Sequence, residues 1–229
     1  MELERDALYC INKPLDKTSF YVVLQLRNTL SKYFKEKKLK VGHAGTLDPK
    51  ATGLLIICTG KKTKEIDQFM GLPKEYTAEI CIGATRVGYD MEGEIVEEFD
   101  ISNITAQEIT AAAAQLTGTI LQTPPPHSAV MIDGKRAYEL ARAGKEVEIA
   151  PREVTIQYFD ITYINLPYIG CRIGCSKGTY IRSLAHDFGK ILNNGAHLTG
   201  LQRTKIGDYK LEEAWNLEEF ITFVRSKMV

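Results

Sequence analysis

The sequence predicts an α+β fold in which helices flank a mixed, largely antiparallel sheet. Strand-like and helix-like segments follow one another without the regular strand–helix–strand rhythm of a parallel sheet. The chain has 229 residues, of which 44% are hydrophobic and 25% charged, so it can bury a sizeable core and does not have a disordered composition. No internal repeat, low-complexity tract or linker interrupts it. We therefore predict a single domain over residues 1–229.

The first half of the chain predicts four strands and two helices. An apolar segment at 7–11 predicts a strand that ends at Asn12-Lys13-Pro14. Thr18 or Ser19 can cap a helix whose apolar positions keep helical spacing. These positions are Val22, Val23, Leu26, Leu30 and Phe34. We expect a loop over 41–51, a buried strand over 54–58, a helix over 61–70 and an alternating strand over 76–83, which Gly93 turns into a return strand at 94–97.

The second half predicts further helices and strands. Thr105 and Glu108 form a capping-box pattern at the start of an alanine-rich helix that reaches Leu116. Three prolines at 124–126 break regular structure and start a loop that reaches Gly134. The remaining expected elements are a short helix at 137–143, paired strands at 153–164 and 168–175, a helix at 180–192, a strand at 198–206 and a closing helix at 217–227.

Cysteine usage and hydropathy predict a cytoplasmic protein. The five cysteines include no Cys-x-x-Cys pair, so we expect reduced thiols in the core rather than disulfides or a zinc site. The longest apolar run, 54–58, is too short to span a bilayer. The first twenty residues do not combine a basic segment with an apolar one, so we expect no secretion signal.

The net charge is zero, but positive charge is concentrated locally. Between Ser31 and Lys64 there are nine lysines against only Glu36 and Asp48, a net charge of +7. A lysine run alone is most often a solvated surface. This run surrounds a glycine-rich loop with one acid at its centre, which is typical of a phosphate-binding surface.

That loop, residues 42–53, reads Gly-His-Ala-Gly-Thr-Leu-Asp-Pro-Lys-Ala-Thr-Gly. Pro49 disfavours the helical conformation for Asp48, and the three glycines allow tight turns or the close approach of another backbone. The loop lacks the Gly-Lys-Ser/Thr ending of a nucleotide-binding P-loop. Taken alone, the pattern leaves both a catalytic role and a turn-capping role open for Asp48.

Five spaced motifs resemble the TruB family of tRNA pseudouridine synthases. The 42–53 loop, continued by Leu54-Leu55, resembles the family's signature loop. The other four are Asn12-Lys13-Pro14 with Thr18-Ser19, Lys74-Glu75-Tyr76, the Gly-Thr-Tyr-Ile-Arg segment at 178–182, and the Leu-x-x-Leu-x-Arg-Thr segment at 198–204. They occur in the family's order and cover about residues 8 to 206.

The resemblance implies a pseudouridine synthase fold, an isomerase activity and no cofactor. Conversion of uridine 55 in the TΨC loop to pseudouridine breaks the C1′–N1 bond, rotates the base and joins C1′ to C5. The reaction involves no redox change. Asp48 is implied as the catalytic carboxylate, acting as a nucleophile or as a base toward the sugar, and both are accepted roles for aspartate.

The resemblance also implies roles for five other residues. Arg182 is expected to pair with the Asp48 carboxylate, although by itself it could be an ordinary structural arginine. Tyr76 and Tyr180 are expected to pack on a flipped base, because every base offers a π surface, although isolated tyrosines are usually core residues. His43 is expected to stack in the RNA loop, and Leu201 to line the uracil pocket.

The implied partner is the TΨC stem-loop of tRNA, bound by a monomer. The lysines at 35–40 and 61–64, with Lys17, Lys135 and Arg136, would supply phosphate contacts that offset the cost of flipping the base. A segment at about 124–152, with His127, Ser128 and Tyr138, resembles a family insertion that grips the RNA.

The chain departs from the family pattern in two places. Val87-Gly88 replaces an expected polar pair of the Thr-Asp-Thr-x-Asp-x-x-Gly pattern, although Asp90 and Gly93 remain. Only 23 residues follow Ile206, so we expect no complete carboxyl-terminal PUA domain.

Two other functions fit parts of the pattern. A non-catalytic module that binds or folds tRNA on the same fold would have no need of a buried acid at Asp48. A glycosidase would usually need two carboxylates, whereas the signature loop offers one.

Overall fold

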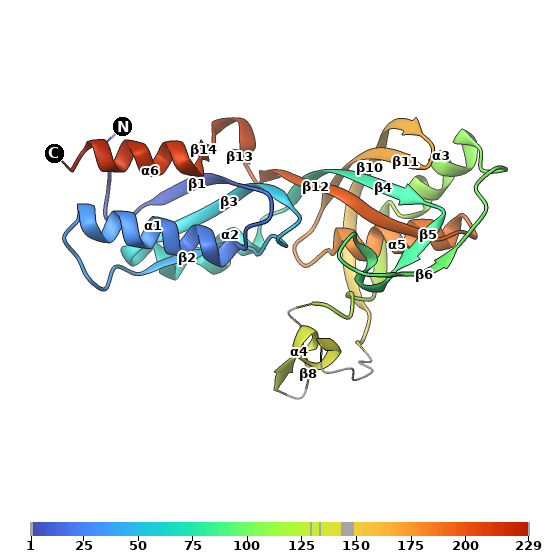
Figure 1. Cartoon of the computed structure of the whole chain (residues 1–229), viewed down its shortest axis with the longest axis horizontal. Helices are drawn as coiled ribbons and strands as arrows, with labels where there is room; N and C mark the ends of the chain where they lie inside the picture. Colours follow the sequence, from blue (N-terminus) through green and yellow to red (C-terminus); the bar gives the residue numbers. More distant parts are fainter. Residues whose placement is uncertain (1, 129, 133, 143–148, 229) are drawn as a thin grey trace. The chain divides into compact units, whose positions relative to one another are not determined.

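The computed structural model describes residues 2–128, 130–132, 134–142 and 149–228. The chain forms two compact units. Unit 1 contains residues 1–76 and 201–229, and unit 2 contains residues 77–200. Two strands, β4 (Lys74–Ile82) and β12 (Ala196–Ile206), run from one unit into the other (Figure 1).

Strand β3 (Thr52–Thr59) is the centre of the unit 1 sheet. It pairs antiparallel with β1 (Leu8–Lys13) and with β2 (Val41–His43), and parallel with β12. On the far side of β1 lies β14 (Trp215–Asn216), which is parallel to it. Strand β13 (Tyr209–Lys210) turns back antiparallel on β12. The sheet is therefore mixed but mostly antiparallel.

Both faces of the unit 1 sheet are covered, which explains why the middle of β3 is apolar without alternation. Leu55 and Ile57 point into one cluster, and Leu54, Ile56 and Cys58 into another, all fully buried.

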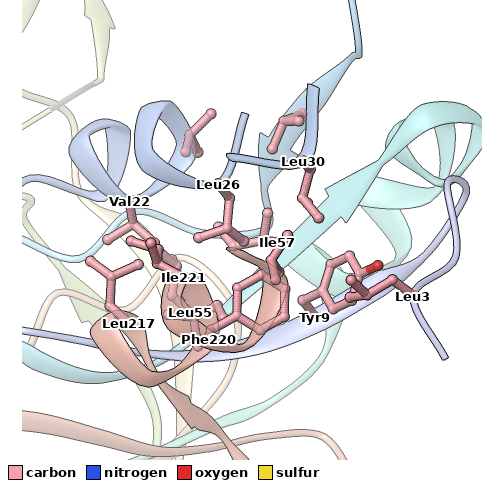
Figure 2. Close-up of a cluster of buried hydrophobic side chains, with 14 of the residues drawn as sticks. Leu3, Tyr9, Val22, Leu26, Leu30, Leu55, Ile57, Leu217, Phe220 and Ile221 are labelled. Carbon is pink, nitrogen blue, oxygen red and sulfur yellow. The ribbon is translucent and has the colours of Figure 1, made fainter. Parts of the chain in front are cut away.

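Two helices, α1 (Ser19–Tyr33) and α6 (Leu217–Ser226), cover the first face. Figure 2 shows Leu26 and Leu30 of α1 directed toward Ile57 and Phe220. The helices start where the sequence supplies caps, because the side chains of Thr18 and Asn216 accept hydrogen bonds from the first turns.

On the second face, the short helix α2 (Ile66–Gly71), which follows a 3₁₀ turn, η1 (Gly60–Glu65), packs Ile66 and Phe69 against the cluster. A single helix was predicted at 61–70. The observed segment starts as a tighter 3₁₀ turn, in which Thr63 Oγ1 donates 2.7 Å to the Gly60 carbonyl. A second 3₁₀ turn in this unit, η3 (Leu211–Glu213), joins β13 to β14.

Unit 2 carries the strand order β4, β11 (Tyr168–Cys175), β10 (Arg152–Asn165) and β7 (Gly118–Gln122). The two pairs that β10 makes are antiparallel, as predicted for 153–164 and 168–175. Helices α3 (Ala106–Gln115) and α5 (Ile181–Ile191) supply buried apolar residues to this unit. One example is Phe188, whose ring centroid lies 5.6 Å from that of Phe159 on β10. The predicted capping box of Thr105 and Glu108 is confirmed.

The smaller elements of unit 2 differ from the prediction. The strand after Gly93, β6 (Ile95–Glu98), pairs with β5 (Ala84–Arg86) and not with β4. Between them lies a 3₁₀ turn, η2 (Val87–Tyr89). The loop after the prolines contains a small hairpin, β8 (Met131–Ile132) with β9 (Lys135–Arg136), followed by α4 (Ala137–Arg142).

All five cysteines are free thiols, as predicted from their spacing. Burial raises the pKa of Cys10 and Cys58 to about 11 and that of Cys171 to about 12, so these thiols stay protonated at neutral pH. No helix among the described ranges combines the length and the apolar character needed to cross a membrane.

Candidate active site

The Asp48 loop joins β2 to β3 in unit 1. The Ala44 amide donates to the Ile56 carbonyl over 2.9 Å, so β2 continues its contact with β3 just as the loop begins. At the other end, the Ala51 amide donates to the Asp48 carbonyl over 3.0 Å and closes a turn around Pro49. Asp48 is half-buried, while its neighbour Leu47 is buried. The residues that were expected to form one loop therefore contain the short strand β2.

Ser19, the first residue of α1, holds the middle of this loop. Its hydroxyl donates to the Leu47 carbonyl over 3.0 Å and accepts from the Leu47 amide over 2.8 Å. Ser19 is only 2% exposed, so both bonds lie in a water-poor environment, where hydrogen bonds are strong. The residue just before Asp48 is thus attached to the start of a helix.

Lys13, at the end of β1, is a buried cation beneath the same loop. Its ammonium donates to the carbonyls of Pro14 (2.9 Å), Lys17 (2.6 Å) and Pro49 (3.3 Å). Burial lowers the pKa of Lys13 to about 8, and the charge of Asp48 opposes that shift. Lys13 therefore places a positive charge close enough to sense Asp48 and ties the carbonyl of the residue after Asp48 to the end of β1.

Arg203 on β12 holds the two ends of the loop together. It is 1% exposed; its Nε donates to the Leu54 carbonyl over 2.8 Å, and its Nη2 to the Gly45 carbonyl over 3.0 Å. Gly53 lies opposite Arg203 in the parallel register of β3 and β12 and has a φ of 107°. A Cβ on Gly53 would lie 2.6 Å from the Arg203 backbone nitrogen, so only glycine lets the two strands approach.

The other predicted site residues of unit 1 lie on β2, β4 and β12. His43 ends β2, where burial and then the Arg203 charge lower its pKa below the usual 6.5, so its imidazole is neutral at pH 7. Tyr76 on β4 is 8% exposed, and Leu201 on β12 is half-buried. Thr204 Oγ1 donates to Glu75 Oε1 over 2.7 Å, which joins β12 to β4 at this point.

Arg182 lies in the first turn of α5 in unit 2 and is only 7% exposed. Its Nη1 donates to the Gly88 carbonyl over 3.2 Å and lies 3.4 Å from Asp90 Oδ2, while its Nη2 donates to the His127 carbonyl over 3.0 Å. Two segments, 87–90 and 123–128, therefore meet at this guanidinium. The motifs pointed to Arg182, Asp90 and His127 separately but did not connect them, because their segments lie far apart in the sequence.

Tyr180 precedes α5 and is fixed through its backbone. Its amide donates to Gln122 Oε1 over 2.8 Å, and its carbonyl accepts from Gln122 Nε2 over 3.1 Å. The Arg152 guanidinium lies over the Tyr180 ring, 4.9 Å from its centroid. Gln122 is fully buried, yet no motif pointed to it, because a lone glutamine before a proline run has no special pattern.

Four of the six predicted site residues, His43, Asp48, Tyr76 and Leu201, belong to unit 1. Tyr180 and Arg182 belong to unit 2. Each group is held by its own unit, and the pairing of Arg182 with Asp48 stays a prediction.

The predicted RNA-gripping insertion is described in part. Ser128 is 3% exposed, and Lys135 is exposed on β9. The side chains of Arg136 and Tyr138 lie outside the described residues, as do residues 143–148. Elsewhere, the lysine surface of unit 1 is solvent-exposed at Lys32, Lys35, Lys37, Lys38, Lys40, Lys61 and Lys64.

Two family models match this chain. The TruB family pseudouridylate synthase (N terminal domain) matches residues 31–181, and the tRNA pseudouridylate synthase B C-terminal domain matches residues 182–227. The chain therefore belongs to the TruB family of pseudouridylate synthases. The single domain predicted over 1–229 stays a prediction.

Individual relatives support the same class. A tRNA pseudouridine synthase B of Bacteroides fragilis is 49% identical over 221 residues, covering 96% of this chain and 94% of the relative. One from Flavobacterium johnsoniae is 53% identical over 211 residues, covering 92% of each. The predicted enzyme class, a tRNA pseudouridine synthase and hence an isomerase, is confirmed.

The fold has solved counterparts. A chain in the crystal structure of a Cbf5-Nop10-Gar1 complex superposes with a TM-score of 0.73 at 27% identity, covering 96% of this chain. The present chain spans 54% of the length of that counterpart. The predicted pseudouridine synthase fold, with a mixed sheet and flanking helices, is confirmed.

Among the residues that the structure describes, no group of three or more His, Cys, Asp or Glu side chains is arranged to hold a metal ion.

Proposed function

We propose that this enzyme converts uridine 55 in the TΨC loop of tRNA to pseudouridine, with Asp48 as the catalytic carboxylate. The base flips out of the loop, its C1′–N1 bond breaks, and C1′ joins C5. The C5 proton leaves and N1 gains one, so no atom or electron enters or leaves overall. Asp48 acts either as the nucleophile or as the base that starts this exchange.

The observation that carries the proposal is the support of the Asp48 loop by three buried polar side chains. Ser19, Lys13 and Arg203 bind the backbone at positions 47, 49 and 45, on both sides of the aspartate. Each is less than 3% exposed. A turn-capping aspartate would not need this support, whereas a reacting carboxylate must be held in place within a fraction of an ångström.

The partner is proposed to be tRNA, approached through the exposed lysines of unit 1. Their side chains are free to reach phosphates, and the salt dependence of binding would report how many do so. Tyr76, Tyr180, His43 and Leu201 are proposed to surround the flipped base. Arg182 is proposed to orient the Asp48 carboxylate, and no cofactor is proposed.

The test is pseudouridine formation on an unmodified tRNA transcript, mapped by position, beside a transcript with cytidine at position 55. Asp48→Asn should abolish the product while tRNA affinity is retained, because the amide keeps the shape but cannot act as nucleophile or base. Asp208→Asn, an exposed carboxylate in the β12–β13 turn, is the matched control and should keep full activity. Pseudouridine formed by Asp48→Asn at the wild-type rate would refute the role of Asp48.

Two other results of the same assay would contradict the proposal, and each would indicate a different function. Free uracil in the supernatant would make the protein a glycosidase. Tight binding by the wild type without any product would make it a module that binds or folds tRNA.

A further inference from the structure

The segment in which this chain departs from the family pattern forms a ring stack with α5. The Tyr89 and His186 rings lie 3.9 Å apart between centroids, with an angle of 7° between their planes. Both residues belong to unit 2, Tyr89 to η2 and His186 to α5. Parallel rings at this distance are in full van der Waals contact.

His186 lies four residues after Arg182 on α5, so the two side chains project from the same face of the helix. Arg182 contacts the two residues that flank Tyr89, namely the Gly88 carbonyl at 3.2 Å and the Asp90 carboxylate at 3.4 Å. The 88–90 segment is thus bound to this one face of α5 at two points, the guanidinium and the ring.

The backbone of this segment needs such a restraint. Gly88 has a φ of 76° and Tyr89 a φ of 68°. A left-handed conformation costs a residue with a Cβ roughly 1–2 kcal/mol and persists only where the surroundings impose it. The sequence offers Val87-Gly88 where the family pattern has a polar pair, so side-chain hydrogen bonds from those two positions are not available.

The environment of the stack favours two uncharged rings. Burial, with a smaller contribution from the Lys190 charge, lowers the pKa of His186 to about 4, so the imidazole is neutral at pH 7. Burial also raises the pKa of Tyr89, with a contribution from Asp187. Two neutral rings can stack without the desolvation cost of a charge.

We propose that Tyr89 and His186 are positioning residues for catalysis: their stack fixes the 88–90 segment so that the Gly88 carbonyl and the Asp90 carboxylate hold the Arg182 guanidinium in its reactive orientation. This inference rests on the catalytic role proposed above for Arg182. In this chain, ring contact restrains the 88–90 segment in place of hydrogen bonds from polar side chains at positions 87 and 88.

The test measures the single-turnover rate of pseudouridine formation with saturating enzyme, together with tRNA affinity. Tyr89→Ala and His186→Ala should each lower the rate on the order of tenfold to a hundredfold, because small misplacements of a catalytic group have effects of this size. The tRNA affinity should not change. Tyr89→Phe and His186→Phe should restore most of the rate, because each keeps a flat ring.

A matched control removes a different stack. Trp215 and Phe223 of unit 1 stack at 5.2 Å and 28°, and Phe223→Ala should lower the melting temperature without lowering the rate. If Phe223→Ala slows the reaction as much as Tyr89→Ala at the same temperature, the effect is general destabilisation and the inference fails.

A double-mutant cycle tests the route of the effect. Because Tyr89 is proposed to act through both Asp90 and the Gly88 carbonyl, Tyr89→Ala should lower the rate less in an Asp90→Asn background than in the wild type. Full additivity of the two effects would overturn the inference, as would a wild-type rate for Tyr89→Ala. Arg182→Lys is measured in parallel: a wild-type rate there would contradict the proposed role of Arg182, while Asp48→Asn separately tests the reaction itself.

Discussion

In unit 1 the Asp48 loop is held by polar side chains that reach its backbone, whereas in unit 2 the 88–90 segment meets α5 through a ring stack and one guanidinium. Ser19, Lys13 and Arg203 each bind a backbone group of the first loop. Tyr89 packs on His186, and Arg182 binds the residues on either side.

The difference teaches that buried hydrogen bonds demand particular residue types, whereas ring contact demands only shape. Lys13, Ser19 and Arg203 therefore lie within recognisable motifs. Tyr89 occupies an unspecified position of a partly matched pattern, and His186 lies in no motif. The positions that hydrogen-bond to the Asp48 loop should therefore tolerate fewer replacement residues than the two positions of the ring stack.

The largest loss of stability expected in unit 1 follows from a substitution at Gly53, where the backbones of β3 and β12 are in contact. Gly53→Ala should lower the free energy of unfolding by about 3 kcal/mol or more, since it adds a Cβ against the Arg203 backbone at a left-handed φ. Urea denaturation measures this. Gly71→Ala is the matched control, because a Cβ there meets nothing within 4 Å, and it should leave stability nearly unchanged. Equal stability of the two variants would show that β3 and β12 can separate without cost.

Lys13→Met should have the next largest effect. Three carbonyls lose their buried donor, so the free energy of unfolding should fall by about 1–3 kcal/mol at pH 7. If Lys13→Met is as stable as the wild type, packing of the methionine side chain replaces the three hydrogen bonds. The Asp48 loop would then not differ from the 88–90 segment in its need for buried hydrogen bonds.

The difference in stability between the wild type and Lys13→Met should change with pH in a definite direction. The pKa of Lys13 is about 8 in the folded chain against 10.5 ordinarily, so between these pH values the unfolded chain binds more protons. The stability of the wild type should therefore rise relative to Lys13→Met from pH 8 to 10.5, on the order of 1–3 kcal/mol. Parallel stability curves for the two proteins over this range would contradict the buried position of the ammonium.

The smallest expected effect compares one helix cap from each unit. Thr105→Ala in unit 2 should cost about 1 kcal/mol, because it removes one half of a capping box. Thr18→Ala in unit 1 should cost less, because Thr18 makes one capping bond and α1 is anchored by fully buried side chains. Serine at either position should restore stability, as measured by urea denaturation. A larger loss for Thr18→Ala would reverse the ranking.

Much of the fold was predictable where one residue type enforces one conformation. The Thr18 and Thr105 caps, the paired strands around Pro167 and the buried strand β3 all appear where expected. Short strands without alternation were missed, among them β2, β5 and β7. Gly93 was expected to lie in a turn between β4 and a return strand that pairs with β4. In the structure that return strand, β6, pairs with β5 instead. Gly93 lies against Val87, and a Cβ added to it would be 2.6 Å from the Val87 carbonyl carbon.

From the sequence one can infer the enzyme class and the fold, because five spaced motifs match one family in residue type and in order. The glycine-bounded loop around Asp48 is the longest of these motifs, although its pattern alone leaves the role of Asp48 open. Only the tertiary structure decided what holds that loop and what surrounds Arg182. Gly88, Asp90 and His127 reach the guanidinium from segments more than fifty residues away in the chain. Contacts of that range depend on how helices and strands pack, and packing is specified by shape summed over many side chains rather than by any local pattern.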